Sequence, residues 1–128
     1  MRTIALFGAL AVALGAFGAH GLKELVGPEQ LATFNTGVRY HFYHTLAMAI
    51  AFGLAQRTDL RANRLLQARW AWGIGILLFS GSLYLLTLEA QIGIPAKILG
   101  PITPIGGVFF IVGWVLLFLS PKTKLSNE

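Results

Sequence analysis

The sequence predicts an all-α integral membrane protein in which a single domain of 128 residues forms a four-helix bundle. Hydrophobic residues make up 55% of the chain and charged residues only 12%, about half of the roughly 25% found in soluble proteins. Four apolar stretches also approach the about 20 residues that a helix needs to cross a bilayer. A surface with so few charges indicates that lipid, rather than water, surrounds much of the molecule.

The predicted spans follow one another along the chain. They cover residues 3–22, 40–56, 70–88 and 104–119, so that residues 1–128 form one transmembrane domain. The second span is the least apolar, because its sequence YHFYHTLAMAIAFGLAQ is polar over the first third. The first span follows Arg2 as the apolar part of a signal peptide would, but it is longer than that part usually is, and we interpret it as a span.

The distribution of basic residues predicts the orientation. With four spans, both termini and the loop between the second and third spans lie on one side of the membrane. That side holds Arg2, Arg57, Arg61, Arg64, Arg69, Lys122 and Lys124, against Lys23, Arg39 and Lys97 on the other side. The positive-inside rule therefore places both termini in the cytoplasm. The arginines from Arg57 to Arg69 are also candidates for binding anionic lipid headgroups.

The composition argues against several other classes of site. The chain contains no cysteine, which excludes disulfides and thiolate metal ligands. Its net charge of +5 is not arranged as a basic face with interspersed aromatic residues, so nucleic acid is not an expected partner. The sequence shows no serine-centred triad, phosphate loop or dinucleotide-binding fingerprint. We expect no cofactor and, on balance, no enzymatic activity.

A short amphipathic helix is predicted on the outer surface between the first and second spans. Pro28 suits the first turn of a helix. Leu31, Phe34 and Val38 recur at helical spacing with polar residues between them. This helix is expected to continue into the second span through a kink near Gly37.

Small residues predict how the spans pack. In lipid, helices associate where small side chains let their backbones approach each other. Ala11, Gly15 and Ala19 form such a stripe on the first span, which we therefore expect at the centre of the bundle. At the start of the fourth span, Thr103 is expected to cap the helix and Pro104 to occupy its first position.

Polar side chains gather at the outer end of the predicted bundle, where all three histidines fall. Ionisable residues inside a bilayer usually face the bundle interior or a cavity. The candidate residues of an outer-facing polar pocket are His20, His44, Tyr84, Ser80, Ser82, Thr103 and Glu89. Three interpretations of the histidines stay open: a metal site formed by His20, His41 and His44, a proton relay or pH sensor, and hydrogen bonding at the membrane interface.

Four motifs resemble those of one family: ALGAFGAHGL at 13–22, YHFYHTLA at 40–47, LFSGSLYLL at 78–86 and ITPIGGVFFIVGW at 102–114. They resemble the YgdD-like membrane proteins, also called domain of unknown function 423, which are similar to the eukaryotic transmembrane protein 256. The resemblance covers nearly the whole chain and implies a four-helix protein of the bacterial inner membrane, without implying a biochemical function. It also implies that His20 and His44 belong to family motifs and that His41 departs from them, so we expect His44 to face His20.

These observations predict a multipass inner-membrane protein that binds or conducts a small molecule, ion or lipid through the outer-facing pocket, as a homo-oligomer if it transports. The alternative is a structural or assembly protein. That alternative predicts no cavity at the histidines and close helix contacts at Gly15, Gly18, Gly81 and Gly107. A metal-dependent membrane enzyme is the third hypothesis.

Overall fold

Every regular element is a helix in the part of the chain that the computed structural model describes, residues 1–57, 62–93 and 95–120. The elements are α1 (Arg2–His20), η1 (Leu22–Glu24), α2 (Pro28–Arg57), α3 (Ala62–Gly75), η2 (Ile76–Ser80), α4 (Gly81–Thr87), α5 (Glu89–Ile92), α6 (Ala96–Leu99) and α7 (Ile102–Phe118). α3, η2 and α4 form one continuous segment, in which η2 is a π-helix. The prediction of an all-α fold is confirmed for the described residues.

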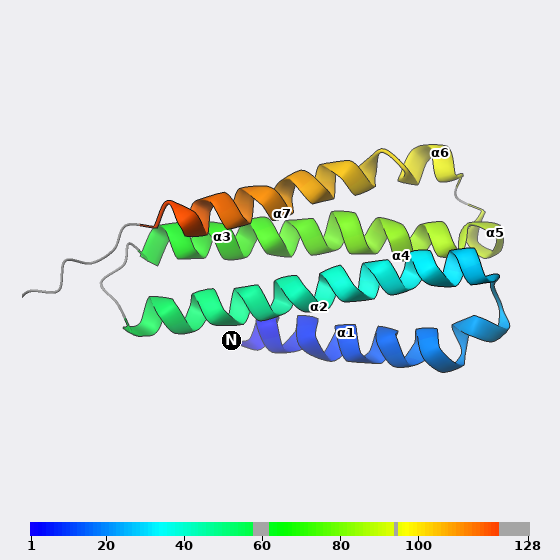
Figure 1. Ribbon diagram of the computed structural model, residues 1–128, viewed down its shortest axis with the longest axis horizontal. Helices are drawn as coiled ribbons and strands as arrows, with labels where there is room; N and C mark the ends of the chain where they lie inside the picture. The colour runs from blue at the N-terminus through cyan, green and yellow to red at the C-terminus, as the bar shows by residue number, and fades with distance from the viewer. Residues whose placement is uncertain (58–61, 94, 121–128) are drawn as a thin grey trace, which may run out of the picture.

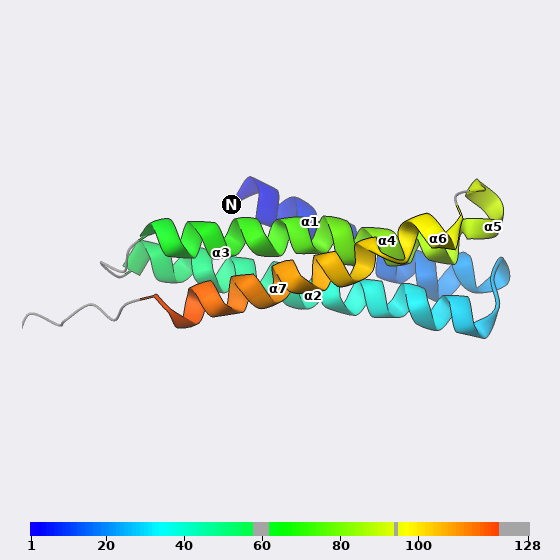
Figure 2. The ribbon, with the colours of Figure 1, turned by 90° about the horizontal axis from the view of Figure 1, so that it is seen from above.

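α1, α2, the α3–η2–α4 segment and α7 run lengthwise beside one another, with α5 and α6 at one end (Figure 1). α2 packs against α1 and also against α3, η2 and α4. α7 packs against α3 and η2, and Figure 2 shows it following that segment along its length. The prediction that the first span lies at the centre is wrong, because α1 packs mainly against α2 and lies at an edge.

Three helical segments of the described residues are long and apolar enough to cross a membrane: Arg2–Glu24, Ala62–Thr87 and Ala96–Phe118. α2 has 30 residues, which is enough length for a crossing, but the polar residues of its first half make it less apolar than these three. The number of spans and their orientation stay predictions. Among the basic residues used to predict the orientation, Arg61, Lys122 and Lys124 and the side chain of Arg57 lie outside the described part of the structure.

The first part of α2 takes the place of the predicted surface helix. Phe34 in this part is only 1% exposed, because the rings of Phe17 on α1 and Tyr84 on α4 pack against it, with centroids 6.2 and 4.9 Å away. At Gly37, the Tyr84 ring would lie 2.8 Å from an added Cβ, so the absent side chain lets α4 approach. The prediction that this helix lies on the outer surface is therefore wrong, whereas its start at Pro28 and its continuation into the second predicted span are confirmed.

Glycines on α1 set its distance from α2. An added Cβ would lie 3.4 Å from Val38 at Gly15 and 3.1 Å from the Phe34 ring at Gly18. Gly18 is buried, whereas Ala19 of the predicted stripe is exposed. Small residues thus form the contact face of α1, as expected. At the C-terminal end of α1, however, the buried residue is Gly18 and not the predicted Ala19.

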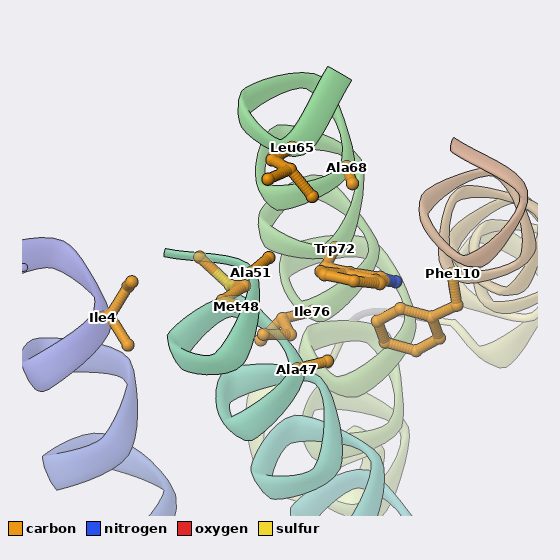
Figure 3. Packing of buried hydrophobic residues seen from close by; sticks show 9 residues of the cluster. All are labelled: Ile4, Ala47, Met48, Ala51, Leu65, Ala68, Trp72, Ile76 and Phe110. Carbon is orange, nitrogen blue, oxygen red and sulfur yellow. The ribbon is translucent and has the colours of Figure 1, made fainter. Parts of the chain in front are cut away.

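The apolar core lies between α2, α3 and α7, with one residue of α1 at its margin (Figure 3). It consists of Ile4, Ala47, Met48, Ala51, Leu65, Ala68, Trp72, Ile76 and Phe110. The rings of Trp72 and Phe110 each pack against a glycine of the opposite helix. A Cβ at Gly75 would lie 2.5 Å from Phe110, and a Cβ at Gly113 would overlap the Trp72 ring. These glycines therefore let α3 and α7 approach each other closely.

α7 begins at Ile102, directly after Pro101. The prediction that Thr103 caps this helix and that Pro104 opens it is wrong by two residues. Pro104 still lies in the first turn, where backbone N–H groups have no acceptor within the helix. Thr103 lies inside the helix, so its hydroxyl is available to the neighbouring helix α4.

Candidate functional site

Two buried histidines lie near the middle of α2. His41 and His44 are 3% and 5% exposed, and His41 follows Pro28 by 13 residues, which is about 20 Å at roughly 1.5 Å per residue. They were predicted at the outer start of a span, which stays a prediction; within α2 (Pro28–Arg57) both lie near the middle, several turns after its first residue. Three residues apart, they point to different neighbours.

His41 is hydrogen-bonded to α4 and packed against α1. Its Nδ1 lies 3.1 Å from the hydroxyl oxygen of Tyr84, and the edge of the Phe7 ring meets the imidazole with centroids 5.7 Å apart. Its Nε2 is buried and forms no hydrogen bond of regular geometry, although the backbone of Phe7 lies close enough to interact with the imidazole. Although His41 departs from the family motifs, its side chain joins three helices.

His44 is fully engaged with α7 and with its own helix. Nδ1 lies 2.8 Å from the backbone oxygen of Tyr40, which can only accept, so Nδ1 carries the proton. Nε2 then accepts a hydrogen bond from Nε1 of Trp114, at 3.3 Å. The imidazole also stacks on Phe110, with centroids 3.6 Å apart and planes inclined by 6°. Both nitrogens are satisfied in one neutral tautomer, so His44 has no atom left for a ligand.

His20 lies far from both of these histidines. It ends α1 with an exposed side chain, at the level where Gly18 packs on Phe34. His44 lies on α2 beside Thr45, which packs against Gly8 near the other end of α1. The prediction that His44 faces His20 is therefore wrong, and within the described residues no group of three His, Cys, Asp or Glu side chains is placed to hold a metal ion.

Hydroxyl groups on one face of the η2–α4 segment continue the contact made by His41. Ser80, Tyr84 and Thr87 recur at i, i+4 and i+7, which places them on one side of a helix. The Thr87 hydroxyl lies 3.2 Å from the backbone oxygen of Gln30 on α2 and 2.9 Å from that of Leu83, and these two acceptors share its single proton. Ser80 is 0% exposed, and its Oγ has no hydrogen-bond partner. We call Ser80, Tyr84, Thr87 and His41 the polar column.

One end of the polar column opens on a groove at the end of the molecule where α2 begins. The groove has a volume of about 260 Å³ and is lined by Leu25, Val26, Gly27, Gln30, Leu86, Thr87, Glu89, Ala90 and Gln91. Thr87 belongs to both the groove and the column. Among the predicted pocket residues, only Glu89 lines the groove. Its Oε1 also accepts a hydrogen bond from the backbone N–H of Ala96, at 2.9 Å.

Ser82 and Thr103 form a contact on a different face. The Ser82 hydroxyl donates to the backbone oxygen of Phe79, at 2.9 Å, so the Thr103 hydroxyl donates to Ser82 Oγ, at 2.7 Å. This pair joins α4 to α7 and is satisfied internally. The structure therefore divides the predicted pocket residues between the polar column, the groove and two contacts with α7, and leaves His20 apart from all of them.

Thr87 and Trp114 are the important residues that the sequence interpretation missed. The spacing of Ser80, Tyr84 and Thr87 was visible in the sequence and could have identified Thr87. Trp114 follows Phe110 by one helical turn, so a search for residues that pack together on that span could have found it. Its hydrogen bond to His44 depends on how α2 and α7 are placed, and no pattern within either helix indicates it.

Comparisons with known proteins place the chain among uncharacterised membrane proteins. Residues 14–107 match the family described as "Protein of unknown function (DUF423)". The chain is 44% identical over 111 residues to the UPF0382 membrane protein YwdK of Bacillus subtilis, covering 87% of this chain and 85% of that protein. It is 44% identical over 125 residues to a UPF0382 membrane protein of Haemophilus influenzae, covering 97% and 94%. No solved structure matches.

Proposed function

Because this chain belongs to the DUF423 family, as its motifs predicted, and the family is one of unknown function, we propose a function from the structure itself. We propose a multipass inner-membrane protein that binds or conducts a small molecule or ion through the polar column. In this proposal α2 supplies a fourth span and both termini lie in the cytoplasm. Support for the fourth span comes from α2 packing between α1 and α3, two helices apolar enough to cross the membrane.

The carrying observation is that the polar column, whose Thr87 lines the groove, contains two buried polar atoms without a hydrogen bond of regular geometry, His41 Nε2 and Ser80 Oγ. A polar group left without a hydrogen bond in an apolar interior is destabilising by roughly 1–3 kcal/mol. Ionisable residues inside a membrane are rare and usually functional. A ligand that bonds to these atoms removes the penalty, which gives the column a physical reason to bind one.

The chemistry of the column selects the kind of ligand. Its groups are an imidazole, a phenol and two aliphatic hydroxyls, none of which carries a fixed charge. Such groups suit a proton, water or a small neutral hydrogen-bonding molecule better than a metal cation, which prefers carboxylates or several imidazoles. The carboxylate of Glu89 lies at the groove, where the ligand would enter.

Of the ligands allowed by this proposal, the proton is the one whose conduction can be measured without first identifying a substrate. The protein is reconstituted into vesicles that contain a pH-sensitive dye, and a pH gradient is imposed. Wild-type vesicles are expected to lose the gradient faster than empty ones. Tyr84→Phe removes the hydroxyl bonded to His41 but keeps the ring that packs on Gly37, and is expected to restore the rate of empty vesicles.

The matched control is Ser82→Ala, which removes a hydroxyl from the same helix outside the column and should leave the rate unchanged. Equal rates for wild-type and empty vesicles would reject proton conduction. A high-resolution experimental structure in which His41 Nε2 and Ser80 Oγ contact neither water nor another ligand would reject the wider proposal of a ligand in the column.

A structural or assembly role is the second candidate. It is favoured by the hydrogen bonds that hold α7, because their donors and acceptors are satisfied within the protein. His44 and Ser82 each hold this helix through one hydrogen bond. Close contacts occur at the predicted Gly15 and Gly18, but nothing lies within 4 Å of an added Cβ at Gly81. At Gly107 the nearest atom would be 3.8 Å away. This role predicts that Tyr84→Phe changes stability alone. Under either role, a homo-oligomer stays part of the proposal.

A further inference from the structure

An apolar groove lies between α1 and α3, at the end of the molecule that carries the N-terminus. It has a volume of about 290 Å³ and is lined by Thr3, Phe7, Met48, Leu66, Arg69, Trp70, Gly73, Ile74 and Leu77. The groove arises because α1 packs mainly on α2 and leaves the side of α3 open. Met48 of α2 forms its floor.

Arg69 is the one charged residue in the lining of this groove. Its guanidinium carbon lies 4.9 Å from the centroid of the Phe52 ring, which orients the group, and its buried Nε has no hydrogen-bond partner. Within residues 1–57, 62–93 and 95–120 the single ion pair joins Lys23 to Glu24. Arg69 therefore has no carboxylate partner among these residues, and a guanidinium group is suited to bind a phosphate.

The groove has the length and polarity of one leaflet. Leu66 and Leu77 are 11 residues apart, about 16 Å at roughly 1.5 Å per residue, which is half of a hydrocarbon core of about 30 Å. Arg69 and the exposed Trp70 lie toward one end. Trp is enriched where a membrane meets water, and the other end, near Ile74 and Leu77, is apolar.

We propose that this groove binds an anionic phospholipid, with one acyl chain along the groove and the phosphate hydrogen-bonded to Arg69. The occupant follows from the positive charge, the apolar lining and the membrane that surrounds the chain. Phe7 lines this groove and also packs against His41, but no residue of the polar column lines the groove, so this proposal does not depend on the column. With the orientation proposed above, the lipid belongs to the cytoplasmic leaflet.

The test is native mass spectrometry of the protein in detergent with phosphatidylglycerol and phosphatidylcholine of the same acyl chains. Wild-type protein is expected to retain phosphatidylglycerol about fivefold better, the factor expected for one basic residue at an anionic surface. Arg69→Gln should remove this preference, and Arg69→Lys should keep part of it. Arg64→Gln is the matched control, because Arg64 is also half-buried on α3 but does not line the groove.

A second variant tests the acyl-chain part of the site without altering charge. Gly73→Leu adds a side chain whose nearest neighbour at Cβ is Met48, at 3.8 Å, so the leucine extends into the groove and should abolish retention of both lipids. An unchanged preference in Arg69→Gln, an equal loss in Arg64→Gln, or normal retention in Gly73→Leu overturns the proposal. Displacement of the lipid by excess inorganic phosphate overturns the proposal in favour of a free phosphate as the occupant. The mass of a dimer in place of that of lipid-bound protein overturns it in favour of a second copy of the chain.

Discussion

Replacing Gly106 by alanine should separate α7 from the π-helix η2. An added Cβ at this position would overlap the backbone nitrogen of Phe79 and lie 2.7 Å from its Cα. Backbone atoms cannot rotate away as a flexible side chain does, so α7 has to move outward. This movement also stretches the hydrogen bonds that join α7 to Ser82 and His44.

The expected loss in the free energy of unfolding is about 3 kcal/mol. Overpacking of a close contact costs roughly 1–3 kcal/mol. We expect a loss at the upper end of this range because the added Cβ would overlap backbone atoms of Phe79. Gly81→Ala is the matched control, since nothing lies within 4 Å of an added Cβ there. Alanine favours a helix over glycine by up to about 1 kcal/mol, so this variant should be at least as stable as wild type.

Both variants can be compared by unfolding the purified protein in detergent and following the helical circular dichroism signal. Wild-type stability in Gly106→Ala would refute the close contact between α7 and η2. An equal loss in the two variants would show that any added methyl group destabilises these helices, and the positional argument would then fail.

His44→Phe keeps a ring that can stack on Phe110 but removes both hydrogen bonds of the imidazole, so we expect a loss of about 1–2 kcal/mol and a shifted indole N–H signal of Trp114 by NMR. His20→Phe changes an exposed side chain and should stay within about 0.5 kcal/mol of wild type; equal losses would contradict the placement of His44. Thr103→Val removes the donor to Ser82 with little change of shape, and should lower the unfolding free energy by about 0.6 kcal/mol, the average for such bonds in membranes.

The helices could be predicted from the sequence because their signals are local. Long apolar stretches, Pro28 at the start of one helix and Pro104 near the start of another fall within a few residues of the observed boundaries. The first part of α2 was misplaced because its polar residues resemble a surface helix. Its burial depends on Phe17 and Tyr84, which lie on other helices.

The candidate site was harder to predict because it depends on the register between helices. The spacing of His41 and His44 shows that they are near each other, but only the contacts of Gly15 and Gly18 with α2 show which part of α1 lies opposite. This register between α1 and α2 places His20 away from both His41 and His44. The family motif was informative for His44, whereas it gave no indication of the bond between His41 and Tyr84.

The larger helix contacts all join segments that are neighbours along the chain: α1 with α2, α2 with the α3–η2–α4 segment, and that segment with α7. Such local contacts favour rapid assembly, and they let each helix find its partner in the order of synthesis. His41 lies on α2 and Tyr84 on α4, so their hydrogen bond can form only when the α3–η2–α4 segment packs against α2. The hairpin of α1 and α2 by itself therefore leaves the Nδ1 atom of His41 without this partner, and the packing of α4 completes the contact.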